Sequence, residues 1–485
     1  SRAILYNNSF EVIGVGQHPF PQIYPKAGWV EHNLEDIWLS VKKSIEDAIK
    51  QSTDKNFSPE KIQAIGITNQ RETFGLWTRD DSKPISNAVV WQCNRSEELC
   101  AKLKKKPIAK YIEKKTGLKI SPYFSGTKVS FELNRSVKAQ AFAKEGKLCF
   151  GNIDTFLLWK LSGGKSFATD ISNASRTLLM DLESESWDLK ILKELKIPKS
   201  ILPEIKASDA AFGSTLGLDF LPDNIPICGI LGDQQAALFG QGCFAKGEGK
   251  ITYGTGAFML INTGEKKYST KSGVTTVAWK IKGKTVFAVE ASVFIAGAAV
   301  QFLRDNLKII ESSAEIESLA SSVENSDGVF FIPALTGLGS PYWRPEAKGL
   351  LGGLTRRTSR AHIARACLEG IVLSVADVFS ELLKDSKSKI KKIRVDGGAS
   401  KNALLMQEQA DMLQVKIERP KDVESTVRGA AYMAALGSGM IKNQKDLLAF
   451  SETDKTWTSK SSRKESNDKF LVWKRRVKAL LSGAF

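Results

Sequence analysis

One stretch of the chain, residues 225–258, carries two features whose combination suits phosphoryl transfer. The apolar run 225–231 is rich in β-branched residues and predicts a buried strand, and Asp233 follows it. Open α/β sheets place their chemistry at such strand ends. A second predicted strand, 250–253, ends in Gly254-Thr255-Gly256, whose backbone N–H groups and hydroxyl suit a phosphate. The alternative is a pair of structural β-turns in a large enzyme.

The carboxylate of Asp233 suits two roles in such chemistry. It can deprotonate a hydroxyl that attacks a γ-phosphoryl group, and it can hold Mg²⁺. Phosphoryl transfer needs positioning and charge neutralisation more than covalent chemistry, so one well-placed carboxylate is sufficient. The alternative role for an aspartate after a strand is a helix N-cap.

A charge pair, Arg71-Glu72, follows another predicted strand, 62–68. An arginine that donates and a glutamate that accepts can together bind vicinal hydroxyls of a polyol. The alternative is a surface ion pair worth about 0–1 kcal/mol. Aromatic residues that could form the apolar wall for a small carbon skeleton, or equally be core residues, are Trp91, Tyr123 and Phe258.

A second glycine-rich turn, residues 396–402, lies between a predicted strand and a predicted helix. Glycine allows the backbone to approach a nucleotide closely, and the N-terminus of the helix offers N–H groups. Alone, the turn is a weak signal. Together with Gly254-Thr255-Gly256 it predicts two turns that grip one nucleotide.

The elements that must position these residues repeat in a fixed order. A strand, a polar turn and a helix recur three or four times in each half of the 485 residues. This order predicts two α/β domains that face a cleft, with a break near 240–249, and the length also exceeds what one core supports. The last helix is predicted over 470–481, capped by Asn467 or Asp468. No apolar run is long enough to span a membrane, and the six scattered cysteines predict reduced thiols in an intracellular protein.

The net charge of +17 and the pI near 9.4 bear on possible partners. Such a balance is found in nucleic-acid-binding proteins. Here the excess is spread along the chain and is scarcely interleaved with aromatic residues, so we favour solvated basic faces that attract an anionic substrate.

Several runs closely resemble FGGY carbohydrate kinases, in particular the bacterial glycerol kinases of that family. They are GITNQRET (66–73), VVWQCNRS (89–96), SPYFSGTK (121–128), NASRTLL (173–179), GDQQAALFGQ (232–241), TYGTGAFML (252–260) and VDGGASKNALLMQ (395–407). The resemblance extends from residue 1 to about residue 468.

The resemblance implies an α/β fold of two actin-like ATPase (ribonuclease H-like) domains that flank an active-site cleft. Residues 1–242 would form the glycerol-binding domain and residues 243–485 the nucleotide-binding domain. The implied reaction is ATP-dependent phosphorylation of glycerol to sn-glycerol 3-phosphate with Mg²⁺. A cytoplasmic homodimer or homotetramer without nucleic-acid or membrane partners is also implied.

The family's site residues carry over onto matching positions of this sequence. The glycerol-binding set is expected to be Arg71, Glu72, Trp91, Tyr123, Asp233, Gln234 and Phe258, with Asp233 as catalytic base and metal ligand. The nucleotide contacts are expected to be Arg2, Thr255, Gly297, Gln301, Gly398 and Asn402.

Two alternatives and one departure from the family remain. The chain could be another FGGY kinase that acts on a pentulose or a longer polyol, or a non-catalytic actin-like or nucleic-acid-binding protein. The apolar segment 3–6 is typical of the second strand of a hairpin whose first strand is absent. The resemblance places a phosphate loop before residue 1, so we expect the chain to lack a first strand and that loop.

Overall fold

A computed structural model describes residues 1–54, 56–267, 270, 273–344, 346–386, 390, 392–422 and 424–484. The chain divides into two compact units. Unit 1 comprises Ser1–Gly242, Thr276–Phe287 and Ser425–Phe450, and unit 2 comprises Cys243–Thr275, Ala288–Glu424 and Ser451–Phe485. The first change of unit, after Gly242, falls within the predicted break at 240–249. Two later stretches nevertheless belong to unit 1, because their strands and helix pack on its core.

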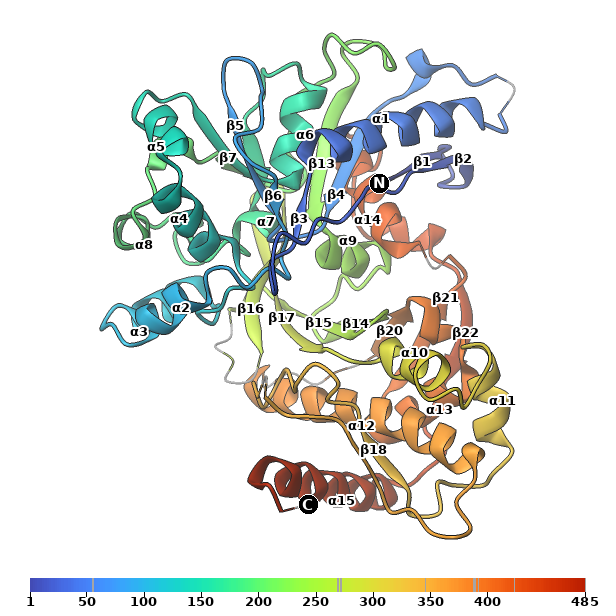
Figure 1. Cartoon of the computed structure of the whole chain (residues 1–485). Helices are drawn as coiled ribbons and strands as arrows, with labels where there is room; N and C mark the ends of the chain where they lie inside the picture. Colours follow the sequence, from blue (N-terminus) through green and yellow to red (C-terminus); the bar gives the residue numbers. More distant parts are fainter. Residues whose placement is uncertain are drawn as a thin grey trace. The chain divides into compact units, whose positions relative to one another are not determined.

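The central sheet of unit 1 is built on two parallel strands, β4 (Ile65–Asn69) and β13 (Pro226–Gly232). They are the apolar runs that predicted buried strands, and β12 (Gly213–Ser214) adds to the far edge of β13. Their register pairs Asn69 with Gly232. The two strands therefore end together, and the residues that follow them emerge at one edge of the sheet (Figure 1).

One face of this sheet is covered by α14 (Ser425–Gly437), a helix rich in small residues. Glycines on the strands allow this close approach: a Cβ on Gly66 would lie 2.2 Å from the carbonyl oxygen of Ala430, and one on Gly229 2.3 Å from the nitrogen of Ala434. The helix that follows β13, α9 (Asp233–Gly240), packs on α14 in the same way. The backbones of the strands and of α14 are therefore in direct contact on this face of the sheet.

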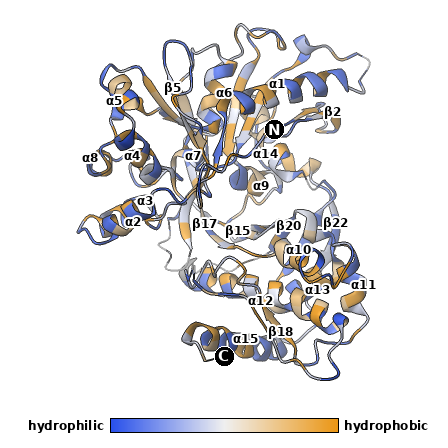
Figure 2. Ribbon diagram, viewed as in Figure 1, coloured by the Kyte–Doolittle hydropathy of each residue, from blue (hydrophilic) through white to orange (hydrophobic). Residues whose placement is uncertain are grey.

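The opposite face carries the apolar core of unit 1. Side chains alternate along a strand, so Ile67 points away from the face to which Gly66 belongs. Ile67 packs in one buried cluster with residues of α1 (Leu34–Lys50) and α6 (Ile153–Leu161). The side chain of Asn33 caps α1 by accepting from the N–H groups of its first turn. Figure 2 shows the outer side of α1 as largely hydrophilic, while the strands beneath it are hydrophobic.

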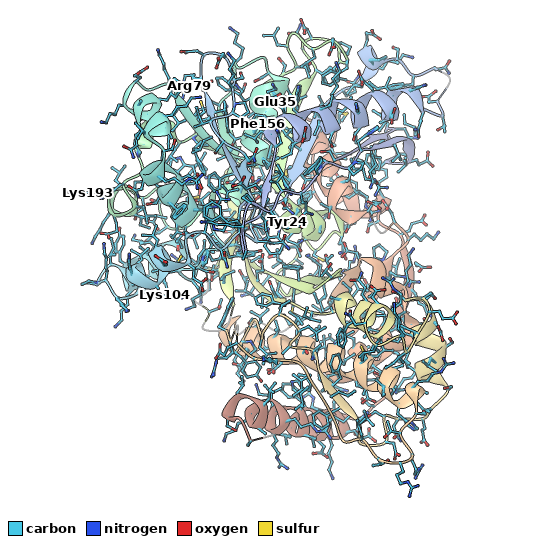
Figure 3. All side chains as sticks on the ribbon, in the orientation of Figure 1. Tyr24, Glu35, Arg79, Lys104, Phe156 and Lys193 are labelled. Carbon is cyan, nitrogen blue, oxygen red and sulfur yellow. The ribbon has the colours of Figure 1, made fainter. Side chains whose placement is uncertain are left out.

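The remaining elements of unit 1 surround this core. A hairpin of β1 and β2 lies under α1, and a four-stranded sheet runs in the order β3-β6-β5-β7. In Figure 3, Phe156 of α6 lies in the interior, whereas Lys104 of α2 and Lys193 of α8 lie at the periphery. Their bounds are β1 Arg2–Tyr6, β2 Val12–Gln17, β3 Glu31–His32, β5 Phe74–Thr78, β6 Ala88–Val89, α2 Glu97–Lys104, α3 Ala109–Thr116, α4 Ser125–Arg135, α5 Val137–Lys144, β7 Leu148–Asn152, β8 Ala168–Asp170, α7 Ile171–Ala174, β9 Met180–Asp181, β10 Ser186–Trp187, α8 Leu189–Leu195 and β11 Glu204–Lys206.

Unit 2 is built on a seven-stranded sheet in the order β16-β17-β15-β14-β20-β21-β22, although the stretch Thr276–Phe287 of β16 and β17 belongs to unit 1. The strands β14, β20 and β21 are parallel, and β15 and β22 run antiparallel to their neighbours. A large buried cluster joins this sheet to the long helix α12 and to α13. The bounds are β14 Glu248–Tyr253, β15 Ala257–Gly264, β16 Val274–Ile281, β17 Lys284–Val293, α10 Gly297–Asp305, α11 Glu315–Ser321, β18 Phe330–Ile332, β19 Leu350–Gly352, α12 Arg360–Ser386, β20 Lys392–Asp396, α13 Ala403–Leu413, β21 Lys416–Pro420, β22 Thr453–Trp457 and α15 Arg463–Ser482.

The prediction for the last helix was wrong about its start. The helix α15 begins at Arg463, earlier than the predicted residue 470, and is not capped by Asn467 or Asp468. Ser462 is the cap, because its hydroxyl accepts from the N–H of Glu465 while the Glu465 carboxylate accepts from the N–H of Ser462.

Gly66→Ala is expected to lower the free energy of unfolding by about 1–3 kcal/mol, because the new methyl would be forced onto a helix backbone that has no room to move. Urea denaturation of the whole chain measures the change. Gly398→Ala is the control, since nothing lies within 4 Å of a Cβ there. Equal effects at the two positions would contradict this account of the packing.

Candidate active site

Asp233 is the first residue of α9, directly beyond the carboxyl end of β13. Gly232 occupies the N-cap position, so Asp233 is not the helix cap that its position after a strand also allowed. Its Oδ1 accepts from the N–H of Gln234 at 2.7 Å, and 31% of the side chain is exposed. The positive end of the helix dipole favours a carboxylate here. The structure therefore presents an ionisable, solvent-accessible acid at the sheet edge.

Arg71 reaches the same point from the end of β4. Its Nε lies 3.0 Å from Oδ1 of Asp233, and only 2% of its side chain is exposed. Gly232 makes room for it, since a Cβ there would lie 2.7 Å from Cγ of Arg71. Arg71 also donates to Oε1 of Gln235 at 3.4 Å, and Gln235 is held in turn by Thr276. The sequence analysis did not single out Gln235 and missed this positioning role.

Glu72 is held by a residue that sequence reasoning did not single out. Nε of Arg176 donates to Oε1 of Glu72 at 2.6 Å, and both side chains are buried. Glu72 adopts a left-handed backbone conformation with φ of 60°, and its carbonyl accepts from the hydroxyl of Ser125 at 2.9 Å. The only signal for Arg176 was its place in the run 173–179. Breaking a buried pair of this kind typically costs 3–5 kcal/mol.

Trp91 and Tyr123 form an aromatic pair beside these charges. Their ring centroids are 5.4 Å apart with the planes at 72°, an edge-to-face arrangement. The guanidinium of Arg176 lies 5.8 Å from the Tyr123 ring centroid. Unit 1 therefore gathers Arg71, Glu72, Trp91, Tyr123 and Asp233, with Gln234 next along α9. These are six of the seven residues expected to bind glycerol.

Lys128 of α4 joins the two aromatic segments. Its Nζ donates to the carbonyl oxygens of Val90, Trp91 and Tyr123, each at 3.2 Å, and the side chain is fully buried. Burial lowers the pKa of this ammonium to about 7, with the carboxylate of Glu72 opposing the shift. Three carbonyls on two separate loops thus share one buried cation, which fixes the loops against each other.

The ends of β4 and β13 are also tied by a buried polar network. Asn69 and Asn173 exchange two side-chain hydrogen bonds of 3.1 and 2.9 Å. Asp170 accepts from Asn173 at 2.9 Å and from Ser172, whose hydroxyl accepts from the N–H of Gly232 at 3.0 Å. This network holds both strand ends in place, so that Arg71 and Asp233 start from fixed positions.

Unit 2 repeats the same construction at the ends of β14 and β20. These parallel strands pair Thr252 with Asp396, so the turns 254–256 and 397–401 leave the sheet side by side. A Cβ on Gly397, which has a φ of 84°, would lie 2.4 Å from the carbonyl oxygen of Tyr253. Thr255 and Gly398 are both exposed. Two exposed glycine-containing turns at one sheet edge suit a phosphate chain.

The helix α10 begins against the first of these turns. The N–H of Gly297 donates to the carbonyl of Gly254 at 3.0 Å, and that of Ala298 to the carbonyl of Thr255 at 3.1 Å. Gln301 lies one turn further along α10 and is exposed. Asn402 caps α13 by accepting from the N–H of Leu405 at 2.8 Å.

Two predicted site residues are not gathered with the others of their set. Arg2, an expected nucleotide contact, lies at the start of β1 in unit 1, whereas the other five belong to unit 2. Phe258, expected in the glycerol wall, is half-buried on β15 of unit 2. Neither unit by its own fold brings these two residues to their predicted partners.

The candidate site offers a divalent cation one accessible carboxylate, that of Asp233. Among the described residues, no group of three or more His, Cys, Asp or Glu side chains could hold a metal ion. Mg²⁺ in nucleotide enzymes is commonly held by one or two carboxylates together with substrate phosphates and waters. The accessible Asp233 fits that arrangement.

No helix in the described part of the chain is long and apolar enough to cross a membrane.

A chain with two phosphate-suited turns and an acid at a sheet edge has the features of a small-molecule kinase. Comparisons with known proteins agree. The N-terminal domain of the FGGY family of carbohydrate kinases matches residues 1–240, and its C-terminal domain matches residues 249–438. The chain therefore belongs to the FGGY family, and it has that family's two-domain, actin-like ATPase fold.

Individual relatives are similar over nearly their whole length. The glycerol kinase of Bdellovibrio bacteriovorus is 47% identical over 98% of this chain and 95% of its own. That of Bacillus cytotoxicus is 46% identical over 99% and 96%. The crystal structure of Plasmodium falciparum glycerol kinase with ADP superposes with a TM-score of 0.94 at 36% identity, covering 99% of this chain and 96% of that one. These alignments do not support the prediction that a first strand and phosphate loop are missing.

Lys128 should titrate far from its usual range. In protein labelled with ¹³C at lysine, we expect one Cε resonance, absent from Lys128→Met, to titrate near pH 7 rather than near pH 10.4. Between about pH 7 and pH 10.4, Lys128 is protonated in the unfolded chain but not in the folded chain. The stability of the wild type relative to Lys128→Met should therefore rise with pH across that range. A midpoint above pH 10 would contradict burial of the ammonium.

Proposed function

We propose that the protein catalyses the ATP-dependent phosphorylation of glycerol to sn-glycerol 3-phosphate. The observation that supports this most strongly is the convergence of Arg71, Glu72 and Asp233 at one sheet edge, each with a defined partner. The chain that carries them is 46–47% identical to glycerol kinases over nearly its full length.

Glycerol is expected to bind through its hydroxyl groups and through its carbon skeleton. The guanidinium of Arg71 donates to hydroxyl oxygens, the carboxylate of Glu72 accepts from hydroxyl groups, and Gln234 adds an amide. Trp91 and Tyr123 form the wall for the carbon skeleton, to which Phe258 of unit 2 is proposed to add. Because Arg71 and Glu72 are buried and pre-paired, little side-chain entropy is lost when the polyol replaces water.

Asp233 is proposed to act as the general base. The terminal hydroxyl of glycerol attacks the γ-phosphorus of ATP, and its proton passes to the carboxylate of Asp233 as the new P–O bond forms and the bond to ADP breaks. Arg71 beside this carboxylate holds it in position until the proton is transferred. When Mg²⁺ is bound it neutralises phosphate charge, and Asp233 is the residue of this chain proposed to contribute to holding it.

The nucleotide is proposed to bind at the turns of unit 2. Thr255 and Gly398 are exposed at neighbouring strand ends, with Gly297, Gln301 and Asn402 on the helices that follow. Backbone N–H groups at such turns and helix starts bind phosphate oxygens without needing a charged side chain. Arg2 of unit 1 is proposed to contribute a further positive charge.

The division of labour between the domains is part of the proposal. Residues 1–242 would supply the glycerol site and residues 243–485 the nucleotide site. A cytoplasmic homodimer or homotetramer that does not bind nucleic acid is likewise proposed. Light scattering of the purified chain measures its mass in solution.

Asp233→Asn should lower kcat/KM for glycerol by about 10²- to 10⁴-fold, the usual contribution of a positioned base. Turnover of the 485-residue chain is followed by ADP release, and glycerol binding by calorimetry. Asp223→Asn, an exposed aspartate in the same unit, is the control and should behave as wild type.

Each outcome of this experiment bears on a separate part of the proposal. Equal turnover by wild type and Asp233→Asn would remove Asp233 as the base. Faster phosphorylation of xylulose or of a longer polyol than of glycerol would overturn the substrate. Retention on nucleic acid at low salt, with no phosphotransfer, would favour the non-catalytic alternative.

A further inference from the structure

The outer surface of α2, α3 and α8 in unit 1 carries a dense group of lysines that the proposed reaction does not use. Six of these lysines are exposed and form no ion pair with any described residue. We call them the lysine ridge: Lys104, Lys105, Lys110, Lys114, Lys190 and Lys193. In Figure 3, Lys104 and Lys193 lie at the edge of the unit.

Contacts between the three helices make the ridge one continuous surface. Nζ of Lys106, in the turn after α2, lies 2.6 Å from Oε1 of Glu194 on α8. The hydroxyl of Tyr111 on α3 donates to Oδ2 of Asp188, the cap of α8, at 2.8 Å. Nζ of Lys190 lies 4.3 Å from the centroid of the Tyr111 ring. Both ends of α8 are therefore held against the segment formed by α2 and α3.

The spacing of the lysines places them on the solvent side of these helices. Lys110 and Lys114 are at positions i and i+4 of α3, and Lys190 and Lys193 are at positions i and i+3 of α8. Each pair therefore lies on one helix face. The opposite face of α3 is buried through Ile112. The ridge is thus the face that these helices present to solvent.

The carboxylates of the same elements do not neutralise the ridge. Glu194 and Glu113 each lie beside a lysine outside the ridge. Asp188 is occupied as the cap of α8. The exposed Glu97 and Glu98 lie in the first turn of α2, at the opposite end of that helix from the ridge. The ridge therefore keeps a local excess of positive charge.

Three features of the ridge favour a lipid surface over nucleic acid. Residues 97–119 and 188–199 contain no arginine, the residue that binds phosphate in a fixed bidentate geometry. Tyr111, the one aromatic residue in these two ranges, has its ring against Lys190, so it is not free to stack on a base. Leu189 lies next to Lys190 and is 63% exposed, and an apolar side chain among lysines can enter the headgroup region of a bilayer.

We propose that the lysine ridge docks unit 1 on a lipid bilayer that carries anionic headgroups. The flexible ammonium groups would be attracted to the negative surface without a fixed geometry, and Leu189 would enter the interface. This attraction raises the affinity about fivefold for each lysine near the surface, and it acts within about 10 Å in 0.1 M salt. The resemblance to FGGY kinases implies no membrane partner, and the proposal departs from that implication without resting on the proposed reaction.

Co-sedimentation of the 485-residue chain with lipid vesicles tests the proposal. In 0.1 M NaCl we expect the chain to bind vesicles made of phosphatidylcholine with about one third phosphatidylglycerol, and to bind pure phosphatidylcholine at least about tenfold more weakly. The triple variant Lys105→Gln, Lys110→Gln, Lys193→Gln should bind the anionic vesicles about 100-fold more weakly than the wild type, because three of the six ridge charges are lost.

A matched control variant separates the ridge from the net charge of the chain. Lys50→Gln, Lys284→Gln, Lys478→Gln removes the same charge from exposed lysines of α1, β17 and α15. Its affinity for the anionic vesicles should stay within about threefold of that of the wild type, because the attraction is screened over short distances. All the substituted side chains are exposed, so both variants should keep the circular dichroism spectrum and the thermal unfolding of the wild type.

A fluorescent label tests which surface meets the bilayer. The natural cysteines are all buried, so Leu189→Cys can be labelled selectively with an environment-sensitive dye. Its emission should rise and shift to the blue when anionic vesicles are added. The same dye attached through Tyr24→Cys, at a position that is 67% exposed and outside the ridge, should not respond.

The proposal is overturned if the ridge variant binds anionic vesicles as tightly as the wild type does, or if neutral vesicles bind the chain as well as anionic ones. It is also overturned if the dye at residue 189 does not respond. Ridge-dependent binding of polyuridylate that is tighter than vesicle binding would assign the ridge to nucleic acid and would equally overturn the proposal.

Discussion

The pairing of β4 with β13 is the constraint on which the candidate site depends. Parallel strands in register end at the same level, and the match of Asn69 with Gly232 brings Arg71 and Asp233 to adjoining positions although they are far apart in sequence. Hydrogen bonds and packing at these strand ends stabilise this register. The Asn69–Asn173 amide pair ties the first strand end, and Ser172 ties the second. Gly232 leaves space that the Arg71 stem fills. A slip of one residue would exchange the core and solvent faces of β4 and separate the ion pair.

Unit 2 uses the same physical device at the turns where we propose that the nucleotide binds. There β14 and β20 end together, and glycines rather than charged residues follow them. The difference in residue type fits the ligands that we propose for the two units. A polyol requires donors and acceptors that can be placed only on side chains, whereas a phosphate chain is bound well by backbone N–H groups that glycine leaves accessible. In the proposed reaction, the polyol would therefore be recognised by side chains and the phosphate chain by the backbone.

The sequence predicted those features that local patterns encode. The strands around 62–68 and 225–231 and the glycine turns are all present, because each has its own apolar run or glycine pattern. Partners across long sequence distances were not predictable. Arg176, Gln235 and Lys128 act on residues tens to more than a hundred positions away, and only the folded chain brings them together. The start of α15 was missed because a complete capping box at Ser462 outweighs the single polar residues nearer the apolar run.

The support of β4 determines how firmly the proposed site is held. One edge of β4 is paired with β13, and one face is in backbone contact with α14. Arg71 and Glu72 follow shortly after this strand, so any fluctuation of β4 moves the groups proposed to bind glycerol.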